Sequence, residues 1–168
     1  AGIACGMKNT GIGNGVQDGS KVKVVIDSPT EITIHHGWTE MGQGVFTMAV
    51  QFLCEATGVN PNFISVKVDT SKDAPCGMTT ASRGTSLIGN SVMEAGKKLK
   101  ADLETHSLQE LVGREYVGEW VCDWTTAIEA DADEPQTHYS YSYATQVVTL
   151  DDSGKVENVF AAHDAGRI

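Results

Sequence analysis

Two segments of this chain carry apolar residues at the spacing of helices that bury only one face. The apolar faces comprise Val45, Met48, Ala49, Phe52, Leu53 and Ala56 in the first segment and Ile88, Val92, Ala95, Leu99 and Leu103 in the second. Intervals of three, four and seven residues place such side chains on one side of a helix. Gly58 follows the first segment as a C-terminal cap. We therefore predict helices over residues 43–57 and 84–104.

Most of the remaining apolar residues alternate with polar ones, which is the pattern of half-buried strands. The predicted strands cover residues 2–8, 21–27, 31–36, 64–68, 139–150 and 155–162. Turn sequences at residues 27–30 and 151–154 would make two hairpins. We also expect a short helix near residues 108–112 and an extended or irregular stretch over 117–128. Helices with one apolar face pack on a sheet, so we predict an α+β fold, with a mixed or mainly antiparallel sheet and two long helices packed on one face.

Size and charge narrow the class of protein. A chain of 168 residues is long enough to bury one sizeable core. Its net charge of −10 argues against nucleic acid and anionic membranes as partners, since both require clustered Lys and Arg. No apolar run reaches the length that a membrane-spanning helix requires. The absence of a secretory signal predicts a cytoplasmic protein with reduced thiols.

The cysteines and histidines lack the spacing of metal sites. Cys5, Cys54, Cys76 and Cys122 are far apart and form no CxxC pair, which argues against a structural zinc or iron–sulfur site in this chain. Cys76 follows a proline in a predicted loop and is the one candidate for a reactive thiol. His35-His36 is interpreted as the end of a strand and not as a pair of ligands.

The turn before the first helix has the composition of a ligand-binding segment. Residues 37–44 read Gly-Trp-Thr-Glu-Met-Gly-Gln-Gly. Gly42 and Gly44 have no Cβ, so a ligand can approach the backbone N–H groups directly. Gln43, between them, has an amide that can donate and accept at once. A polar, planar, anionic ligand would suit this turn, and an ordinary connection between a strand and a helix is the alternative.

A second turn with ligand-binding composition precedes the second helix. Its residues are Thr79, Thr80, Ala81, Ser82, Arg83, Gly84, Thr85 and Ser86. One hydroxyl would suffice as a helix cap, whereas this segment combines several hydroxyls, a guanidinium and a helix N-terminus. Together these groups could hold an anion despite the negative charge of the chain.

With both turns in place, the chain resembles the large molybdenum-binding subunit of the xanthine dehydrogenase and aldehyde oxidase family of molybdenum hydroxylases. The matching segments are Gly37–Gly44, Thr80–Thr85 with Gly89–Val92, and Tyr141–Arg167. The first corresponds to the family's glycine-threonine-glutamate-methionine-glycine-glutamine-glycine turn. Trp38 departs from the pattern, because many relatives carry glycine there, and this difference would alter what approaches the cofactor from that side or have no effect.

The resemblance implies a molybdenum pyranopterin cofactor, with or without an attached nucleotide. It implies cofactor-binding roles for Met41, Gly42, Gln43, Gly44, Thr80, Ala81, Ser82, Arg83, Gly84 and Thr85. The first turn would meet the pyranopterin, and residues 81–85 would line the pterin and its phosphate. No residue of the chain is expected to ligate the metal directly. Glu40 lies in the first turn, and we expect it to stabilise the start of the helix and not to act as a catalytic base.

The resemblance further implies that this chain is part of an oxidoreductase that hydroxylates a purine-like heterocycle or an aldehyde with oxygen derived from water. Iron–sulfur clusters, and FAD in some members, would lie in other domains or subunits. The family's catalytic glutamate has no counterpart here, so residues 1–168 are expected to be one inactive fragment of the molybdopterin-binding domain, truncated at both ends. Its partners would be the rest of the molybdenum subunit, the iron–sulfur and flavin parts, and a small-molecule substrate.

Two other functions fit the same residues. The chain could be an assembly or partner-binding module that kept the fold and lost the cofactor. It could also be a free-standing binder of phosphate ligands. If it is a fragment, apolar surface should be exposed where the missing parts dock, and the isolated chain should self-associate.

Overall fold

The computed structural model describes residues 1–164, and its contacts divide the chain into two compact units. The helical unit comprises residues 17–124. The strand unit comprises residues 1–16 and the chain from residue 125 onward. The end of the Tyr141–Arg167 segment that carries part of the family resemblance lies outside the described residues. Within residues 1–164, no helix is long and apolar enough to cross a membrane.

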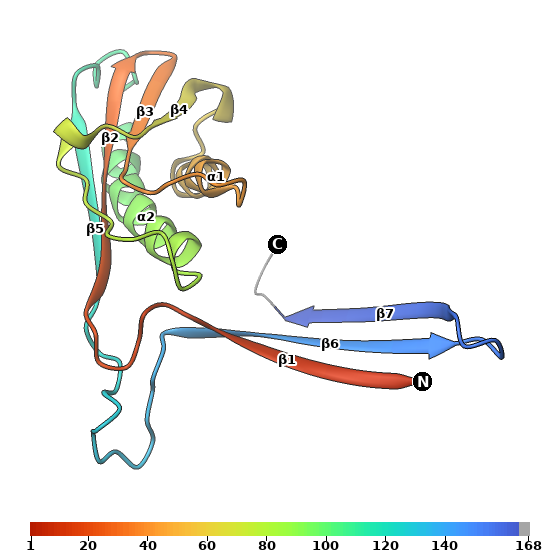
Figure 1. Ribbon diagram of the computed structural model, residues 1–168. Coiled ribbons are helices and arrows are strands. Elements are labelled where there is room, and N and C mark those ends of the chain that lie inside the picture. Colours follow the sequence, from red (N-terminus) through yellow and green to blue (C-terminus); the bar gives the residue numbers. More distant parts are fainter. Residues whose placement is uncertain (165–168) are drawn as a thin grey trace. The chain divides into compact units, whose positions relative to one another are not determined.

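The helical unit contains a mixed four-stranded sheet in the order β4-β3-β2-β5 (Figure 1). Its strands are β2 (Asp18–Ser28), β3 (Glu31–His35), β4 (Ile64–Lys67) and β5 (Glu115–Cys122). β2 runs antiparallel to both β3 and β5, whereas β3 and β4 are parallel. The β2–β3 hairpin is the one that the sequence predicts. Two 3-10 turns, η1 (Pro61–Phe63) and η2 (Thr70–Lys72), flank β4.

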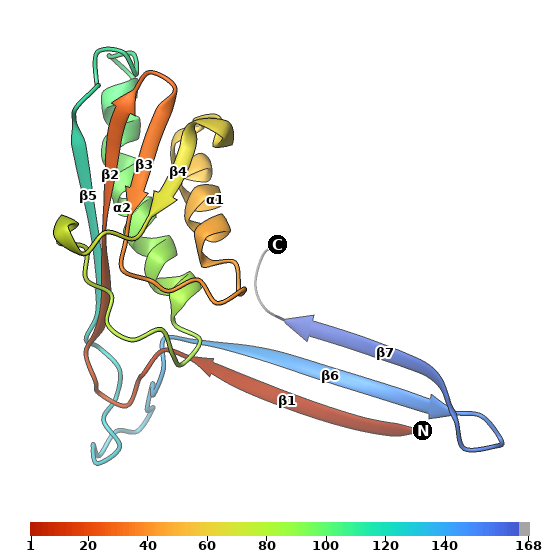
Figure 2. The same cartoon turned by 45° about the horizontal axis from the view of Figure 1, so that its top comes forward.

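Two helices, α1 (Val45–Thr57) and α2 (Gly84–Leu103), pack on each other and on one face of this sheet (Figure 2). α2 lies against β2 and β5, and α1 lies against α2 and β4. The resulting core includes Val22, Val24, Ile26, Ile32, Ile34, Ala49, Leu53, Leu87, Ile88, Val92 and Leu99. This arrangement confirms the predicted α+β fold and both predicted helices.

The approach of α2 to β5 depends on a glycine. A Cβ built at Gly118 would lie only 1.9 Å from the backbone oxygen of Ser91. Any side chain larger than hydrogen would therefore push the helix away from the strand. This glycine also explains why the sequence analysis leaves residues 117–128 partly irregular, because an inward position without an apolar side chain interrupts the alternation that marks a strand.

The prediction of a short helix near residues 108–112 is wrong, since the structure has consecutive turns there. Leu111 N donates to Ser107 O at 3.2 Å, but the chain then leaves the helical path. Gly113 N donates to Ile26 O at 2.8 Å, and Ile26 N donates to Arg114 O at 3.1 Å. Pairing with β2 thus replaces the next helical hydrogen bonds.

The strand unit contains a three-stranded antiparallel sheet in the order β1-β6-β7. Its strands are β1 (Gly2–Thr10), β6 (Ser140–Leu150) and β7 (Val156–Asp164). The hairpin of β6 and β7 confirms the second predicted hairpin. Every described residue of β7 is exposed, and several large apolar side chains of the sheet face solvent.

Candidate functional site

The two turns predicted to bind a ligand border one cavity of about 350 Å³ in the helical unit. Met41, Gln43 and Val45 line it from the first turn and the start of α1, and residues 79–85 line it from the second turn and the start of α2. The structure therefore brings together segments that are about forty residues apart in sequence. Gly42 and Gly44 belong to the first turn without lining the cavity. Val45 lines it and was not predicted, and Thr79 lines it as part of the second predicted turn, although no cofactor-binding role was predicted for it.

A direct hydrogen bond joins the two turns. Thr39 N donates to the Thr79 hydroxyl at 3.1 Å. This contact connects the third residue of the first turn to the residue that opens the second. This hydrogen bond therefore helps to fix the distance between the two walls of the cavity.

Glu40 stabilises the start of α1, as the sequence predicts. Its carboxylate accepts from the N–H groups of Gly42 at 2.8 Å, Gly44 at 3.0 Å and Phe46 at 3.1 Å. Gly44 has a φ of 82°, a left-handed conformation that glycine adopts without strain. The backbone N–H groups of Gly44 and Phe46 hold the pKa of the Glu40 carboxyl below its usual value.

The same contacts correct one part of the prediction for the first turn. The N–H groups of Gly42 and Gly44 face Glu40 and are not open to a ligand. The Gln43 amide does donate and accept at once, but to its own turn. Its oxygen accepts from Met41 N at 2.6 Å, and its nitrogen donates to Thr39 O at 2.8 Å.

The second turn has a strained backbone and ends at a helix without a side-chain cap. Ala81 and Ser82 both have a φ of 52°, in the left-handed region that costs about 1–2 kcal/mol for a residue with a Cβ. In the described part of the chain, no side-chain hydrogen bond caps the start of α2. Gly84 and Thr85, the first two residues of that helix, line the cavity. A helix start of this kind attracts anions through its free N–H groups.

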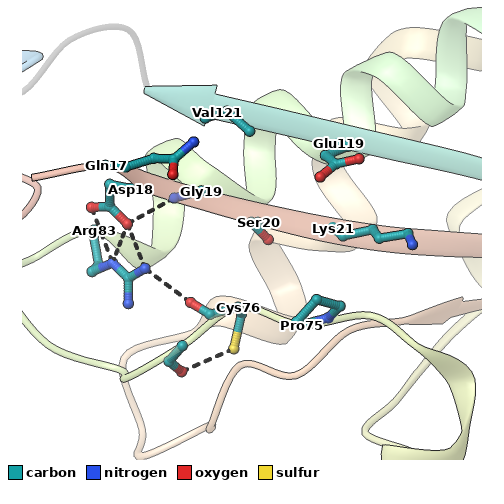
Figure 3. Close-up of a pocket in the computed structure, with 11 residues that line it drawn as sticks. Gln17, Asp18, Gly19, Ser20, Lys21, Pro75, Cys76, Arg83, Glu119 and Val121 are labelled. Atoms are coloured by element: carbon teal, nitrogen blue, oxygen red, sulfur yellow. Dashed lines mark hydrogen bonds and ion pairs between the residues drawn. The ribbon is translucent and has the colours of Figure 1, made fainter. Parts of the chain in front are cut away.

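The structure corrects the role predicted for the Arg83 guanidinium. The side chain is buried and forms an ion pair with Asp18, with Nε donating to Oδ1 at 2.9 Å (Figure 3). Its Nη2 donates to Cys76 O at 2.9 Å, and its Nη1 donates to Met78 O. The guanidinium is thus committed to internal partners, although Arg83 borders the cavity. It is not free to act as the anion-binding fork that the sequence analysis expects.

Two residues contact the Arg83 side chain: Asp18, to which the sequence assigned no role, and Trp38, which was noted only as a departure from the family's turn. Trp38 is fully buried, its ring centroid lies 4.9 Å from the Arg83 guanidinium carbon, and its indole N–H donates to the Ser20 hydroxyl at 3.0 Å. It therefore belongs to the interior of the unit and packs against Arg83. No local pattern marks Asp18, which precedes the strand predicted over residues 21–27 and is the first residue of β2 in the structure.

Cys76 is a poor candidate for a reactive thiol. It is buried, its sulfur donates to Gly77 O at 3.2 Å (Figure 3), and burial raises the pKa of its thiol. A raised pKa keeps the thiol protonated and therefore less nucleophilic. Cys76 borders a second cavity of about 300 Å³ between β2, β5 and the loop at residues 75–77.

His35 ends β3 and His36 follows it in the interior, as expected for a strand end. Within residues 1–164, no three His, Cys, Asp or Glu side chains come together in a way that could hold a metal ion. The chemistry available at the first cavity is therefore hydrogen bonding from hydroxyls, amides and the start of a helix.

Known proteins share both the sequence and the fold of this chain. The family model for the molybdopterin cofactor-binding domain matches residues 1–111. A probable xanthine dehydrogenase subunit of Bacillus subtilis (strain 168) is 31% identical over 109 residues, which is 64% of this chain and 15% of that protein. The chain thus spans less than a sixth of that relative.

Solved structures share the fold. The aldehyde oxidoreductase from Desulfovibrio gigas superposes with a TM-score of 0.77 at 22% identity, over 97% of this chain and 20% of that chain. CO dehydrogenase from Oligotropha carboxidovorans superposes with a TM-score of 0.68 at 20% identity, over 98% of this chain and 26% of that chain. Quinoline 2-oxidoreductase from Pseudomonas putida 86 superposes with a TM-score of 0.63 at 16% identity, over 98% of this chain and 27% of that chain.

Proposed function

Because this chain belongs to the molybdopterin cofactor-binding domain family, we propose that it supplies part of the cofactor site of a molybdenum hydroxylase. The whole enzyme would hydroxylate a purine-like heterocycle or an aldehyde with oxygen derived from water. The observation that carries the proposal is the cavity bordered by both turns, since one ligand can reach Gln43 and Ser82 from it.

The donors at this cavity suit an anionic, planar cofactor. The lining includes three threonines, a serine, a glutamine amide and the start of α2. Hydrogen bonds to a charged acceptor stabilise by about 1.5–3 kcal/mol each, and the start of a helix adds about 0.3–1 kcal/mol. Several such contacts would hold a phosphate without a free cationic side chain.

Within this site, Gln43 and Met41 would meet the pterin ring. Ala81, Ser82, Gly84 and Thr85 would contact the pterin and its phosphate through hydroxyl and backbone N–H groups. Gly42, Gly44 and Glu40 would keep the first turn and the start of α1 in shape. When bound, the molybdenum cofactor supplies the redox chemistry, and the chain supplies binding and orientation.

The catalytic residue and the electron-transfer centres would lie in other parts of the enzyme. The chain covers 15% of its Bacillus subtilis relative, which leaves ample length for them. We propose that iron–sulfur clusters, with or without FAD, accept the electrons. The 168 residues alone would then be one lobe of the cofactor-binding domain and inactive in isolation.

Metal and pterin analysis of the full-length protein, produced with its maturation proteins, tests this function. We expect stoichiometric molybdenum by mass spectrometry and stoichiometric pterin by fluorescence after oxidation. Matured protein that lacks both would contradict the proposal and favour a module that kept the fold and lost the cofactor.

A charge introduced at the cavity locates the site. Thr85 is exposed in the first turn of α2 and lines the cavity, so Thr85→Asp should repel an anionic cofactor while suiting the helix start. We expect at least about a ten-fold loss of molybdenum and pterin. The Tm should not fall when the variant and the unmodified protein are compared without cofactor, since bound cofactor itself raises Tm. Thr47→Asp makes the same change in the first turn of α1, away from the cavity, and should leave cofactor content unchanged.

A further inference from the structure

Asp18, Trp38 and Arg83 form a buried cluster beside the two turns. Asp18 is 3% exposed, Arg83 is 4% exposed and Trp38 has no exposed surface. An ion pair removed from water is favourable only when its remaining hydrogen-bonding groups are also satisfied. The other hydrogen bonds of this cluster therefore show which parts of the fold the ion pair holds together.

The Arg83 guanidinium ties together the two ends of the second turn. Arg83 follows the left-handed residues Ala81 and Ser82, whereas the carbonyls of Cys76 and Met78, which accept from its Nη atoms, precede them. The same guanidinium donates to Asp18 at the start of β2 (Figure 3). One planar group thus closes the loop across its base and attaches it to the sheet.

Trp38 extends this attachment to the first turn. It packs against the guanidinium and immediately precedes Thr39, whose N–H donates to Thr79. Its indole donates to the Ser20 hydroxyl, and the carbonyl of Ser20 accepts from the Ser91 hydroxyl of α2 at 2.8 Å. The cluster therefore joins both turns to β2 and α2.

The loop also hydrogen-bonds to the sheet directly. Lys21 N donates to Pro75 O at 3.0 Å, on the part of β2 that precedes its pairing with β3 at Lys23. Strained backbone persists only where the surroundings hold it. The two left-handed residues of the second turn therefore need these attachments to keep their conformation.

We propose that Asp18, Trp38 and Arg83 are positioning residues that hold the two turns in the arrangement that binds the cofactor. This inference rests on the proposed function of the cavity. Arg83 serves the cofactor through the shape of the loop and not through its charge, because Asp18 neutralises that charge within the interior. Mutations in the cluster should therefore reduce cofactor retention more than they reduce stability.

The paired substitution Asp18→Leu with Arg83→Met separates these two effects in the full-length protein. Apolar replacement of a buried ion pair commonly leaves stability unchanged or higher, but it removes every hydrogen bond from the guanidinium to the loop. We expect molybdenum and pterin content to fall at least about ten-fold, as for supporting residues around other metal sites. With both proteins free of cofactor, the Tm of the variant should stay within a few degrees of that of the unmodified protein, and proteolytic cleavage between residues 77 and 83 should accelerate about ten-fold.

Asp73→Asn is the matched control, since Asp73 forms an exposed ion pair with Lys21 at 2.6 Å. It should change neither cofactor content nor cleavage of the loop. If the paired variant does not fold, Arg83→Lys decides the question. It keeps a charge opposite Asp18 but loses the fork that reaches Cys76 O and Met78 O, and we expect about a ten-fold loss of cofactor.

The outcomes separate the two proposals. Full cofactor content in a folded cluster variant overturns the positioning role and leaves the proposed function intact. Cofactor loss accompanied by a matching fall in the Tm of the cofactor-free variant also overturns it, because a structural role would suffice. An unmodified protein without molybdenum and pterin overturns the proposed function and this inference together.

Discussion

His36 is the buried residue whose protonation should matter most to the stability of the helical unit. It is 1% exposed, and its Nδ1 accepts from Trp38 N at 3.0 Å. The proton of the neutral ring therefore belongs on Nε2, which is buried and has no hydrogen-bond partner in the described part of the chain. Burial lowers the pKa of His36 to about 4.

The folded state should lose stability as the pH falls from 6.5 toward 4. In that range the unfolded chain binds a proton at His36 that the folded chain does not, so protonation favours unfolding. The full effect is roughly 3 kcal/mol. Urea unfolding at pH 7 and pH 4.5 should show this loss as a lower free energy of unfolding at pH 4.5. His36→Gln should reduce the difference between the free energies measured at the two pH values. His106→Gln, at an exposed histidine, should leave the difference unchanged.

Sequence reasoning located the two turns that border the cavity but not the orientation of their side chains. The turns were predictable because glycines and hydroxyls stand directly before helices with one apolar face. The partner of Arg83 was not predictable, because Asp18 lies 65 positions away and only the folded loop brings them together. Glu40 was assigned correctly since its partners are local N–H groups of the same turn.

At the level of elements, local periodicity was sufficient to predict each helix or strand that buries one face. α1, α2 and the hairpins follow from apolar spacing. β5 was only partly predicted because its inward position at Gly118 carries no side chain. Residues 108–112 were misassigned as a helix because pairing with β2 overrides a weak helical pattern. Tertiary contacts therefore decide the segments in which the pattern is short or interrupted.

Gly118→Ala should separate α2 from β5. The added Cβ would meet the backbone oxygen of Ser91 at 1.9 Å and Ala95 N at 2.7 Å, and backbone atoms cannot move aside as a side chain can. We expect the free energy of unfolding to fall by about 3 kcal/mol or more. Gly6→Ala provides the control in β1, where the new Cβ would meet nothing within 4 Å. Equal stability of the two variants would contradict this account.

At the scale of the molecule, the strand unit exposes several large apolar side chains. Ile3 and Phe160 are 71% and 60% exposed, and the register aligns both with Val147 on one face. Val159 and Leu150 are also exposed. A surface of this kind normally marks an interface, and we propose that the rest of the molybdenum subunit covers it in the whole enzyme.

The isolated 168-residue chain should therefore self-associate. Ile3→Lys with Phe160→Lys should shift it toward the monomer in sedimentation velocity, because two charges would have to be buried in the contact. Thr47→Lys with Gln51→Lys adds the same charge on exposed positions of α1 and should leave the association unchanged. If the chain is monomeric without any substitution, its exposed apolar face does not drive association, and the proposed interface on this sheet is contradicted.

The internal neutralisation of Arg83 has a consequence for how a cofactor would arrive. Among the described residues that line the cavity, Arg83 alone is charged and Asp18 cancels that charge, while the chain as a whole carries a net charge of −10. A phosphate-bearing molecule would be repelled at long range and attracted only on contact, by oriented dipoles. Diffusional capture from dilute solution would be slow under such conditions, and hand-over from a carrier docked directly at the mouth would be the more effective route.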